Sequence, residues 1–305
     1  MNRLKRQKKI VAYLCGGLGN QLFIYAAART LADLTGRTLI LTVDAFPYDY
    51  VYRRTFELGG FNIRYDEILP VAPKWRYWLK MKWNGIACKL GLGYCIKERR
   101  NYWFDEHFFA QRSAPTIEIW GYFQSERYFE ANRHVIWTDL AFQNTTAFEC
   151  ELEYKQIVQA EKSVFVHIRS YKDIPGKQDG SAALPIDYYS KALNAMQERV
   201  GSFTAFVFSD DVAWAQQRLT VPTSINTHFV RPSGKGVTFD QMRDFYLMQC
   251  CQHGIVANSS FSWWAAWLGE KRWIAQGFPS VILRPLLHNQ PDFYPVHWEA
   301  IAYNT

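Results

Sequence analysis

The chain has 305 residues, which is long enough for one large domain or for two medium domains with hydrophobic cores of their own. Apolar residues make up 49% and charged residues 21%, which excludes a disordered or fibrous protein. The net charge is +7, and the six cysteines form no CxxC pair. No apolar stretch reaches the ~18 residues of a membrane span, and the apolar run after the basic N-terminus has only a strand's length. We therefore expect no signal peptide, reduced thiols and a cytoplasmic protein.

The first predicted elements are a strand, a glycine-rich corner and a helix. Residues 10–14 form a short apolar run typical of a buried strand, and apolar residues recur every three to four positions from 20 to 34, before Gly36. The corner between them, GGLGN at 16–20, lets the backbone take positive φ and leads into a helix N-terminus, which favours an anion. It is neither the GxGxxG of a dinucleotide fold nor a P-loop, so a plain tight turn is an equal alternative on this stretch alone.

The basic charge is concentrated in two segments. Residues 1–9 carry five basic residues and no acid, and residues 71–100 carry eight against Glu98 alone. Aromatic and apolar side chains interleave the second segment: Trp75, Tyr77, Trp78, Met81 and Trp83. This mixture predicts either a helix in contact with anionic lipid on the inner face of the cell membrane, over residues 74–100, or a solvated basic face. The pI of 9.0 is the only feature that would suggest a nucleic-acid partner, and we therefore expect none.

The second half alternates strand-like and helix-like segments, which predicts a parallel, doubly wound sheet. Residues 60–120 are less regular, and 141–160 resemble a linker with a helix, so we place a boundary near 150–160, between domains 1–155 and 156–305. The predicted strands are 162–169, 204–208 and 253–257, and the predicted helices are 187–200, 212–219, 238–251 and 262–268, the last ending at Gly269.

Polar clusters follow three of these strands: HIRS at 167–170, SDD at 209–211 and NSS at 258–260. Ligands of doubly wound sheets bind at the carboxyl ends of the strands. Arg169 stands at one of these strand ends, either as a ligand-binding residue or as a member of a structural ion pair. His167 fits either the core or the site, and Asp210 and Asp211 resemble a helix N-cap pair.

Five motifs and a tail then occur in order along nearly the whole chain: GGLGNQLFIYAAARTLA (16–32), GYFQSERYF (121–129), VHIRS (166–170), FSDDVAWAQ (208–216), CQHGIVANSSFSWWAAWLG (251–269) and DFYPVHW (292–298). Together they resemble the bacterial α-1,2-fucosyltransferases of glycosyltransferase family 11. The resemblance implies an α/β fold of GT-B type, with two Rossmann-like domains facing a cleft. It also implies GDP-β-L-fucose as donor, inversion at the anomeric carbon, transfer to the 2-hydroxyl of a galactose-type acceptor on an oligosaccharide or lipid-linked glycan, and no metal or other cofactor.

The resemblance implies that the polar clusters form the binding site of the GDP-sugar donor. Arg169 would stabilise the leaving diphosphate, Asp210 or Asp211 would accept from the guanine edge, and the first domain would clamp the nucleotide sugar through its corner. The remaining candidates are Gly19, Asn20 and Gln21 from the corner, His167 from the strand, and Asn258, Ser259, Ser260, Phe261 and Ser262 at the start of the last helix. The serines could instead be caps only, and we expect Trp263, Trp264 and Trp267 to be mostly core.

Two departures from the family pattern bear on the site. Ser170 stands where the family has a second Arg, and Tyr171-Lys172-Asp173 stands where it has Gly-Asp-Tyr, so Lys172 is a candidate for the lost charge. The acceptor hydroxyl also needs a base, for which Asp173, His167 and Glu126 are candidates. The alternatives are a transferase that uses another GDP-hexose and a catalytically silent GDP-sugar or glycan-binding protein.

Overall fold

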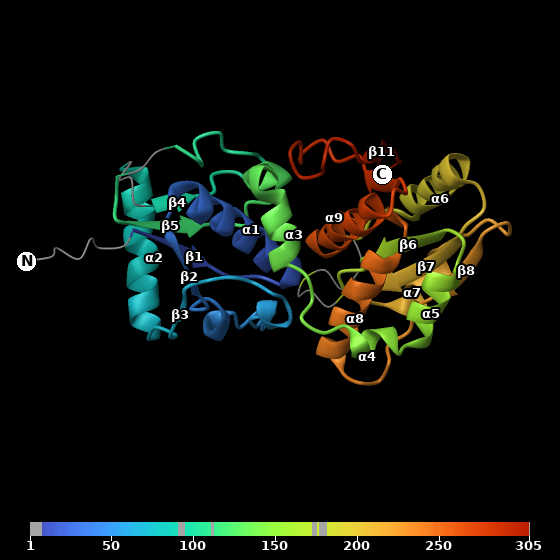
Figure 1. Cartoon of the computed structure of the whole chain (residues 1–305), viewed down its shortest axis with the longest axis horizontal. Helices are drawn as coiled ribbons and strands as arrows, with labels where there is room; N and C mark the ends of the chain where they lie inside the picture. The colour runs from blue at the N-terminus through green and yellow to red at the C-terminus, as the bar shows by residue number, and fades with distance from the viewer. Residues whose placement is uncertain (1–7, 91–94, 111–112, 173–175, 177–181, 305) are drawn as a thin grey trace, which may run out of the picture. The chain divides into compact units, whose positions relative to one another are not determined.

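The computed structural model describes residues 8–304, except 91–94, 111–112, 173–175 and 177–181. The chain divides into two compact units (Figure 1). Unit 1 comprises residues 1–143 and 289–295, and unit 2 comprises residues 144–288 and 296–305. Each unit is built on its own parallel β-sheet.

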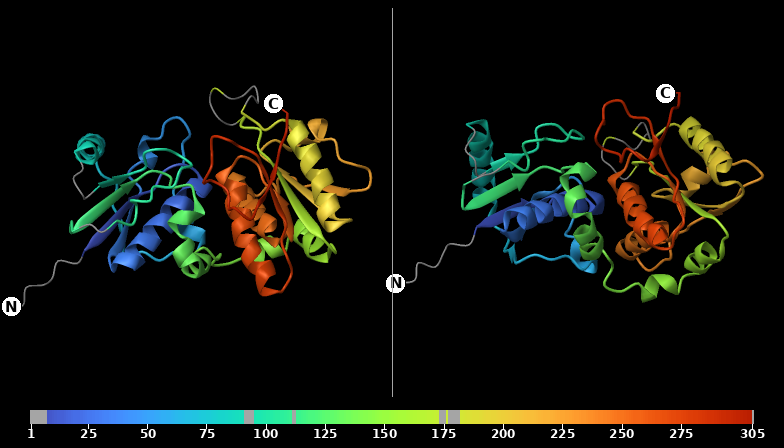
Figure 2. Two further views of the ribbon diagram at one scale, coloured as in Figure 1. Left: turned by 90° about the horizontal axis from the view of Figure 1, so that it is seen from above. Right: turned by 45° about the horizontal axis from the view of Figure 1, so that its top comes forward.

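Unit 1 is a five-stranded sheet in the order β3-β2-β1-β5-β4. Its strands are β1 (Lys9–Tyr13), β2 (Thr38–Thr42), β3 (Glu67–Leu69), β4 (Cys95–Lys97) and β5 (Thr116–Trp120). Its α-helices are α1 (Leu18–Thr35), α2 (Lys74–Lys89) and α3 (Arg133–Asp139), with short 3₁₀ turns at Phe46–Tyr48, Leu58–Gly60, Glu126–Tyr128 and Glu130–Asn132. Helix α1 ends at Gly36, whose φ of 59° is the predicted left-handed stop. Figure 2 shows α1 and α2 on opposite faces of this sheet.

Unit 2 is a six-stranded sheet in the order β11-β10-β9-β6-β7-β8. Its strands are β6 (Ser163–Ile168), β7 (Thr204–Ser209), β8 (Asn226–Phe229), β9 (His253–Ile255), β10 (Ile282–Pro285) and β11 (Glu299–Ile301). Its helices are α4 (Thr146–Glu149), α5 (Leu152–Gln159), α6 (Ile186–Val200), α7 (Val212–Arg218), α8 (Val237–Cys250) and α9 (Ser260–Ala275). Strand β6 is buried along its whole length. Because it pairs in parallel with both β7 and β9, the carboxyl ends of the three strands meet at one edge of the sheet.

Most predicted elements of unit 2 are confirmed, but the predicted end of the last helix is wrong. Helix α9 continues through Gly269 to Ala275. A Cβ at Gly269 would lie 3.1 Å from the Gln249 carbonyl oxygen, so this glycine serves the close packing of α9 against α8. The indoles of Trp263, Trp264 and Trp267 are buried in the core, as expected.

The two units divide earlier than the proposed boundary at 155/156. The short helices α4 and α5 belong to unit 2, where Phe148 and Tyr154 contact the ring of Tyr246 on α8. The segment 289–295 returns to unit 1, where Asp292 accepts from the backbone N–H of Phe104 at 2.9 Å and pairs with Arg127 at 3.2 Å.

The cysteines depart from the prediction at one position. Cys15, Cys150, Cys250 and Cys251 are free thiols, but Cys95 is disulfide-bonded, so the expectation of fully reduced thiols is wrong there. No spacing signature in the sequence marks this bond. Among the described helices, none is long and apolar enough to span a bilayer.

Candidate functional site

Arg169 follows β6 and is held in place by a carboxylate at the end of the next strand. Its guanidinium forms an ion pair with Asp210 after β7, and its side chain is 17% exposed. Asp210 also accepts from the backbone N–H groups of Ser170, at 2.7 Å, and Tyr171, at 3.1 Å. A single carboxylate thus shapes the loop after β6 and orients the predicted phosphate ligand.

His167 lies below this loop, 5% exposed, with its ring 5.8 Å from that of Phe261. Burial, helped by the charge of Arg169, lowers the pKa of the imidazole from 6.5 to about 3. Its Nδ1 is buried and has no hydrogen-bond partner within the described part of the chain. The ring is therefore neutral at physiological pH and a weak proton acceptor.

Asp211 has the capping role predicted for one of the two aspartates. Its Oδ1 accepts from the backbone N–H of Trp214 at 2.9 Å and caps α7. Its Oδ2 pairs with Lys172 at 2.8 Å, and the hydrogen bond from Lys172 lowers the pKa of the carboxyl group. Lys172 thus places positive charge in the loop where Ser170 replaces the family's second arginine.

The cluster at 258–260, which follows β9, is linked to the loop after β6 by Tyr171. This residue has a φ of 59°, and its hydroxyl donates to the Asn258 carbonyl oxygen after β9 at 2.6 Å. Ser259 is the N-cap of α9, and its hydroxyl accepts from the N–H of Phe261 at 3.3 Å. The Ser262 hydroxyl accepts from the N–H of Ala257 at 3.2 Å. Ser259 and Ser262 therefore shape the start of the 16-residue helix α9, where Ser260 also lies.

The glycine-rich corner in unit 1 is a strand-to-helix turn, as predicted. Gly16 has a φ of 74°, and a Cβ there would lie 2.7 Å from the Asn20 amide nitrogen. Gln21 is fully buried, and its side chain donates to the carbonyls of Gly16 and Thr55 and accepts from the N–H of Glu57. These bonds give Gln21 a structural role, fixing the corner against the chain at 55–57.

Asn20 and Gly19 lie in the first turn of α1, at the same corner. The side-chain oxygen of Asn20 accepts from the Gln124 side-chain amide at 3.0 Å. Gly19 is buried. The corner also borders a cavity of about 180 Å³ in unit 1, lined by Cys15, Gly16, Ala45, Phe46, Asp49, Tyr52 and Tyr122. Burial raises the pKa of the Cys15 thiol to about 11, so it is protonated and not nucleophilic at neutral pH.

Several residues of this region carry no signal in the sequence. A Cβ at Gly17 would lie 3.7 Å from the Arg54 guanidinium carbon, so Arg54 adds a cation beside the N-terminus of α1. Arg54 and the cavity residues Asp49 and Tyr52 come from an irregular loop, whose placement no periodicity reveals.

Two of the proposed bases are Glu126 and Asp173. Glu126 accepts from Arg133 at 2.6 Å, and Asp173 lies outside the described residues. The described residues contain no group of three or more potential metal ligands.

The arrangement resembles known proteins in sequence as well as in fold. The family model of "Glycosyl transferase family 11" matches residues 89–284. This chain belongs to glycosyltransferase family 11. Its family-11 sequence is 30% identical to the O-antigen biosynthesis glycosyltransferase WbnK of Escherichia coli over 277 residues, which cover 84% of this chain and 88% of that protein.

Two further comparisons extend the family assignment. The chain is 29% identical to an alpha-1,2-colitosyltransferase of Escherichia coli over 275 residues, covering 85% of this chain and 87% of the relative. A GDP complex of an Arabidopsis thaliana FUT1 mutant aligns with a TM-score of 0.53 at 13% identity, covering 95% of this chain and 75% of that one. This family-11 protein therefore has the predicted GT-B fold.

Proposed function

We propose that this family-11 protein transfers L-fucose from GDP-β-L-fucose, with inversion, to the 2-hydroxyl of a galactose-type acceptor. The observation that carries the proposal is Arg169, oriented by Asp210 at the edge where β6 and β7 end. Family membership and the α-1,2 transferases among the relatives support the reaction class.

In this reaction the acceptor oxygen attacks the anomeric carbon while the bond from that carbon to the β-phosphate oxygen breaks. The electron pair and negative charge pass to the departing GDP, and the acceptor proton passes to a base. Arg169, the N-terminus of α9 and Lys172 would stabilise the growing diphosphate charge. His167 is a poor candidate for the base, because burial lowers its pKa to about 3.

For the acceptor we propose the cavity beside the glycine-rich corner. Tyr52 and Tyr122 offer aromatic rings for the apolar face of a sugar, and the Asp49 carboxylate can accept from sugar hydroxyls. Asp49 is itself fixed by the backbone N–H groups of Tyr52, at 2.9 Å, and Arg54, at 3.3 Å. A lipid-linked acceptor would bring the enzyme to a membrane surface.

The colitosyltransferase among the relatives favours a second donor, GDP-colitose. Colitose lacks the 3-hydroxyl of fucose. A site that hydrogen-bonds this hydroxyl rejects the deoxy sugar, whereas a site without such a partner accepts both. The ratio of kcat/KM for the two donors, measured with one acceptor, decides which sugar the enzyme uses.

The direct test incubates the purified protein with GDP-fucose and a galactose-terminated disaccharide. The proposal predicts GDP release that depends on the acceptor, and a product whose NMR spectrum shows an α-1,2 linkage. Thermal stabilisation by GDP without acceptor-dependent GDP release would instead identify a silent GDP-sugar-binding protein.

A further inference from the structure

Helix α2 turns an apolar stripe toward solvent. Trp75 is 68% exposed and Trp83 is 59% exposed. The other members of the stripe, spaced three or four residues apart, are Trp78, Leu79, Ile86 and, just beyond the helix, Leu90. This spacing places them on one face of the helix. Scattered exposed apolar residues are ordinary, but a continuous row that includes three indoles marks an interaction surface.

The opposite face of α2 packs on the sheet and carries polar as well as apolar side chains, among them Tyr77, whose ring lies 5.3 Å from that of Tyr48. Asn84 is buried and donates to Glu118 of β5. Lys80 pairs with the same carboxylate at 3.0 Å, and its ammonium lies 5.1 Å from the ring of Tyr13. The large apolar side chains of α2 are therefore not all directed at the sheet, and the outward face carries an apolar surface of its own.

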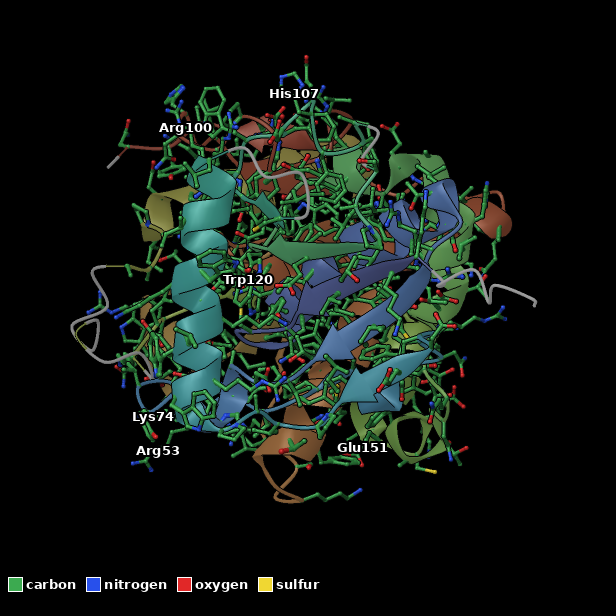
Figure 3. All side chains as sticks on the ribbon, turned by 90° about the vertical axis from the view of Figure 1, so that its left-hand side faces the viewer. Arg53, Lys74, Arg100, His107, Trp120 and Glu151 are labelled. Atoms are coloured by element: carbon green, nitrogen blue, oxygen red, sulfur yellow. The ribbon has the colours of Figure 1, made fainter. Side chains whose placement is uncertain are left out.

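Cations lie beside and within the exposed stripe. Lys74, Arg76 and Lys82 are exposed, and α2 contains no Asp or Glu. Figure 3 shows α2 along the outside of unit 1, with Lys74 near one end of the helix. Lys80 is not part of this surface, because it points inward to Glu118.

This combination fits a lipid surface better than a protein partner. Lysine is depleted at protein interfaces, whereas Trp and basic residues together are enriched where proteins meet the headgroups of anionic bilayers. We propose that α2 docks unit 1 on an anionic bilayer, with the helix axis in the membrane plane and Trp75, Trp78 and Trp83 at the boundary between headgroups and acyl chains. The 16-residue helix would present about 24 Å of contact. This docking does not rest on the proposed transferase activity.

The test is co-sedimentation of the full chain with vesicles of equal parts phosphatidylglycerol and phosphatidylcholine. We expect binding at low salt, weaker binding at high salt because the charges are screened, and little binding to pure phosphatidylcholine. Each cation near an anionic surface contributes about fivefold, so Arg76→Gln with Lys82→Gln should weaken binding about thirtyfold. Replacing Trp75 and Trp83 by Gln should weaken binding by about tenfold for each indole.

Matched controls separate this helix from general basicity. Lys155→Gln with Arg218→Gln removes two exposed cations from unit 2, and Trp103→Gln removes an exposed indole of unit 1 outside α2. These variants should bind vesicles like the unaltered protein, and the α2 variants should keep their turnover on a soluble acceptor. The proposal is overturned if low-salt binding to anionic vesicles is absent, or if control and α2 variants weaken it equally. A concentration-dependent dimer that Trp75→Gln dissociates would likewise overturn it and assign the face to a second copy.

Discussion

Asp210 gathers one guanidinium and two backbone N–H groups around a single carboxylate. The sequence suggested a nucleotide-base acceptor or a helix cap for this residue. Its contacts instead favour a positioning role, in which it shapes the loop and aims Arg169. Asp211 is the residue that caps α7. The sequence did not distinguish Asp210 from Asp211, because both lie between a strand and a helix.

Arg169→Ala should lower kcat about a hundred- to a thousandfold, because the diphosphate gains charge as the glycosidic bond breaks and one oriented donor is lost. Arg169→Lys should restore little, since an ammonium lacks the planar fork. GDP affinity should fall far less than kcat. Steady-state kinetics and GDP titration calorimetry measure the two quantities.

Asp210→Asn is the companion variant, because it removes the ion pair while keeping an acceptor oxygen. We expect an intermediate loss of kcat, with the protein still folded. Asp211→Asn, which keeps an oxygen to cap α7, measures separately the loss of the neighbouring ion pair with Lys172. An Arg169→Ala enzyme with normal kcat and only a raised donor KM would show that Arg169 binds the donor without assisting departure of GDP.

His167 should make folding stability depend on pH. Its pKa is about 3 in the fold against 6.5 ordinarily, so between these values the unfolded chain binds a proton that the folded chain does not. Stability is therefore full above pH 6.5 and falls as the pH drops, with a contribution of about 1.4 kcal/mol per pH unit from this residue. Urea unfolding from pH 7 to 4 should show a shallower slope in His167→Gln than in the unaltered protein.

A second buried histidine provides the comparison. The pKa of His253 is lowered to about 4 by burial, and its Nδ1 accepts from the N–H of Val281 at 3.0 Å. The two slopes should add in the unaltered protein and be separable in single variants. Identical slopes in His167→Gln and the unaltered protein would mean that His167 binds its proton in the folded state as well.

At the scale of elements, strand β9 depends on one glycine. A Cβ at Gly254 would lie 2.3 Å from the ring of Phe165 on the paired strand β6. Gly254→Ala should therefore destabilise the protein by about 1–3 kcal/mol through overpacking. Urea denaturation measures the change, and Gly60→Ala, which has open space around it, is the matched control. Equal stability of the two variants would contradict the packing assigned to β9.

The elements that sequence predicted well are those with strong apolar patterns. Strands β6 and β7 and helices α6 and α8 lie where long apolar runs or helical stripes placed them. Strands β8 (NTHF) and β11 (EAI) were missed because they are short and partly polar, and tertiary pairing alone makes them strands. Gly269 was read as a helix end, although a glycine can also mark close contact between helices.

For the site, the sequence predicted which three strand ends are involved but not the hydrogen bonds and ion pairs that connect their residues. It placed Arg169, Asp210 and Asn258 at one edge, since adjacent parallel strands end together. The sequence did not indicate that the Tyr171 hydroxyl donates to Asn258 or that Arg54 lies beside Gly17. It also did not indicate that the hydrogen bonds of the Gln21 side chain hold the glycine-rich corner in place. Those contacts arise from irregular backbone, which has no period to detect.

At the scale of the whole molecule, the charge distribution bears on metal dependence. We expect turnover to survive a chelator, because Arg169 and the N-terminus of α9 can balance the departing diphosphate in place of a divalent cation. Activity with and without EDTA measures this. Loss of activity that Mn²⁺ or Mg²⁺ restores would contradict the expectation and direct attention to Asp210 and Asp211 as ligands.

The return of residues 289–295 to unit 1 has a consequence for protein engineering. The chain passes between the units at 143/144, 288/289 and 295/296, so neither unit is one continuous stretch of sequence. A chimera made with a single junction near the middle would give unit 1 a foreign copy of the segment that carries Asp292 and Phe293. Asp292 pairs with Arg127, and the ring of Phe293 lies 6.2 Å from that of Phe23 on α1. Exchanging unit 2 between relatives therefore calls for three junctions, with this short segment kept from the parent that supplies unit 1.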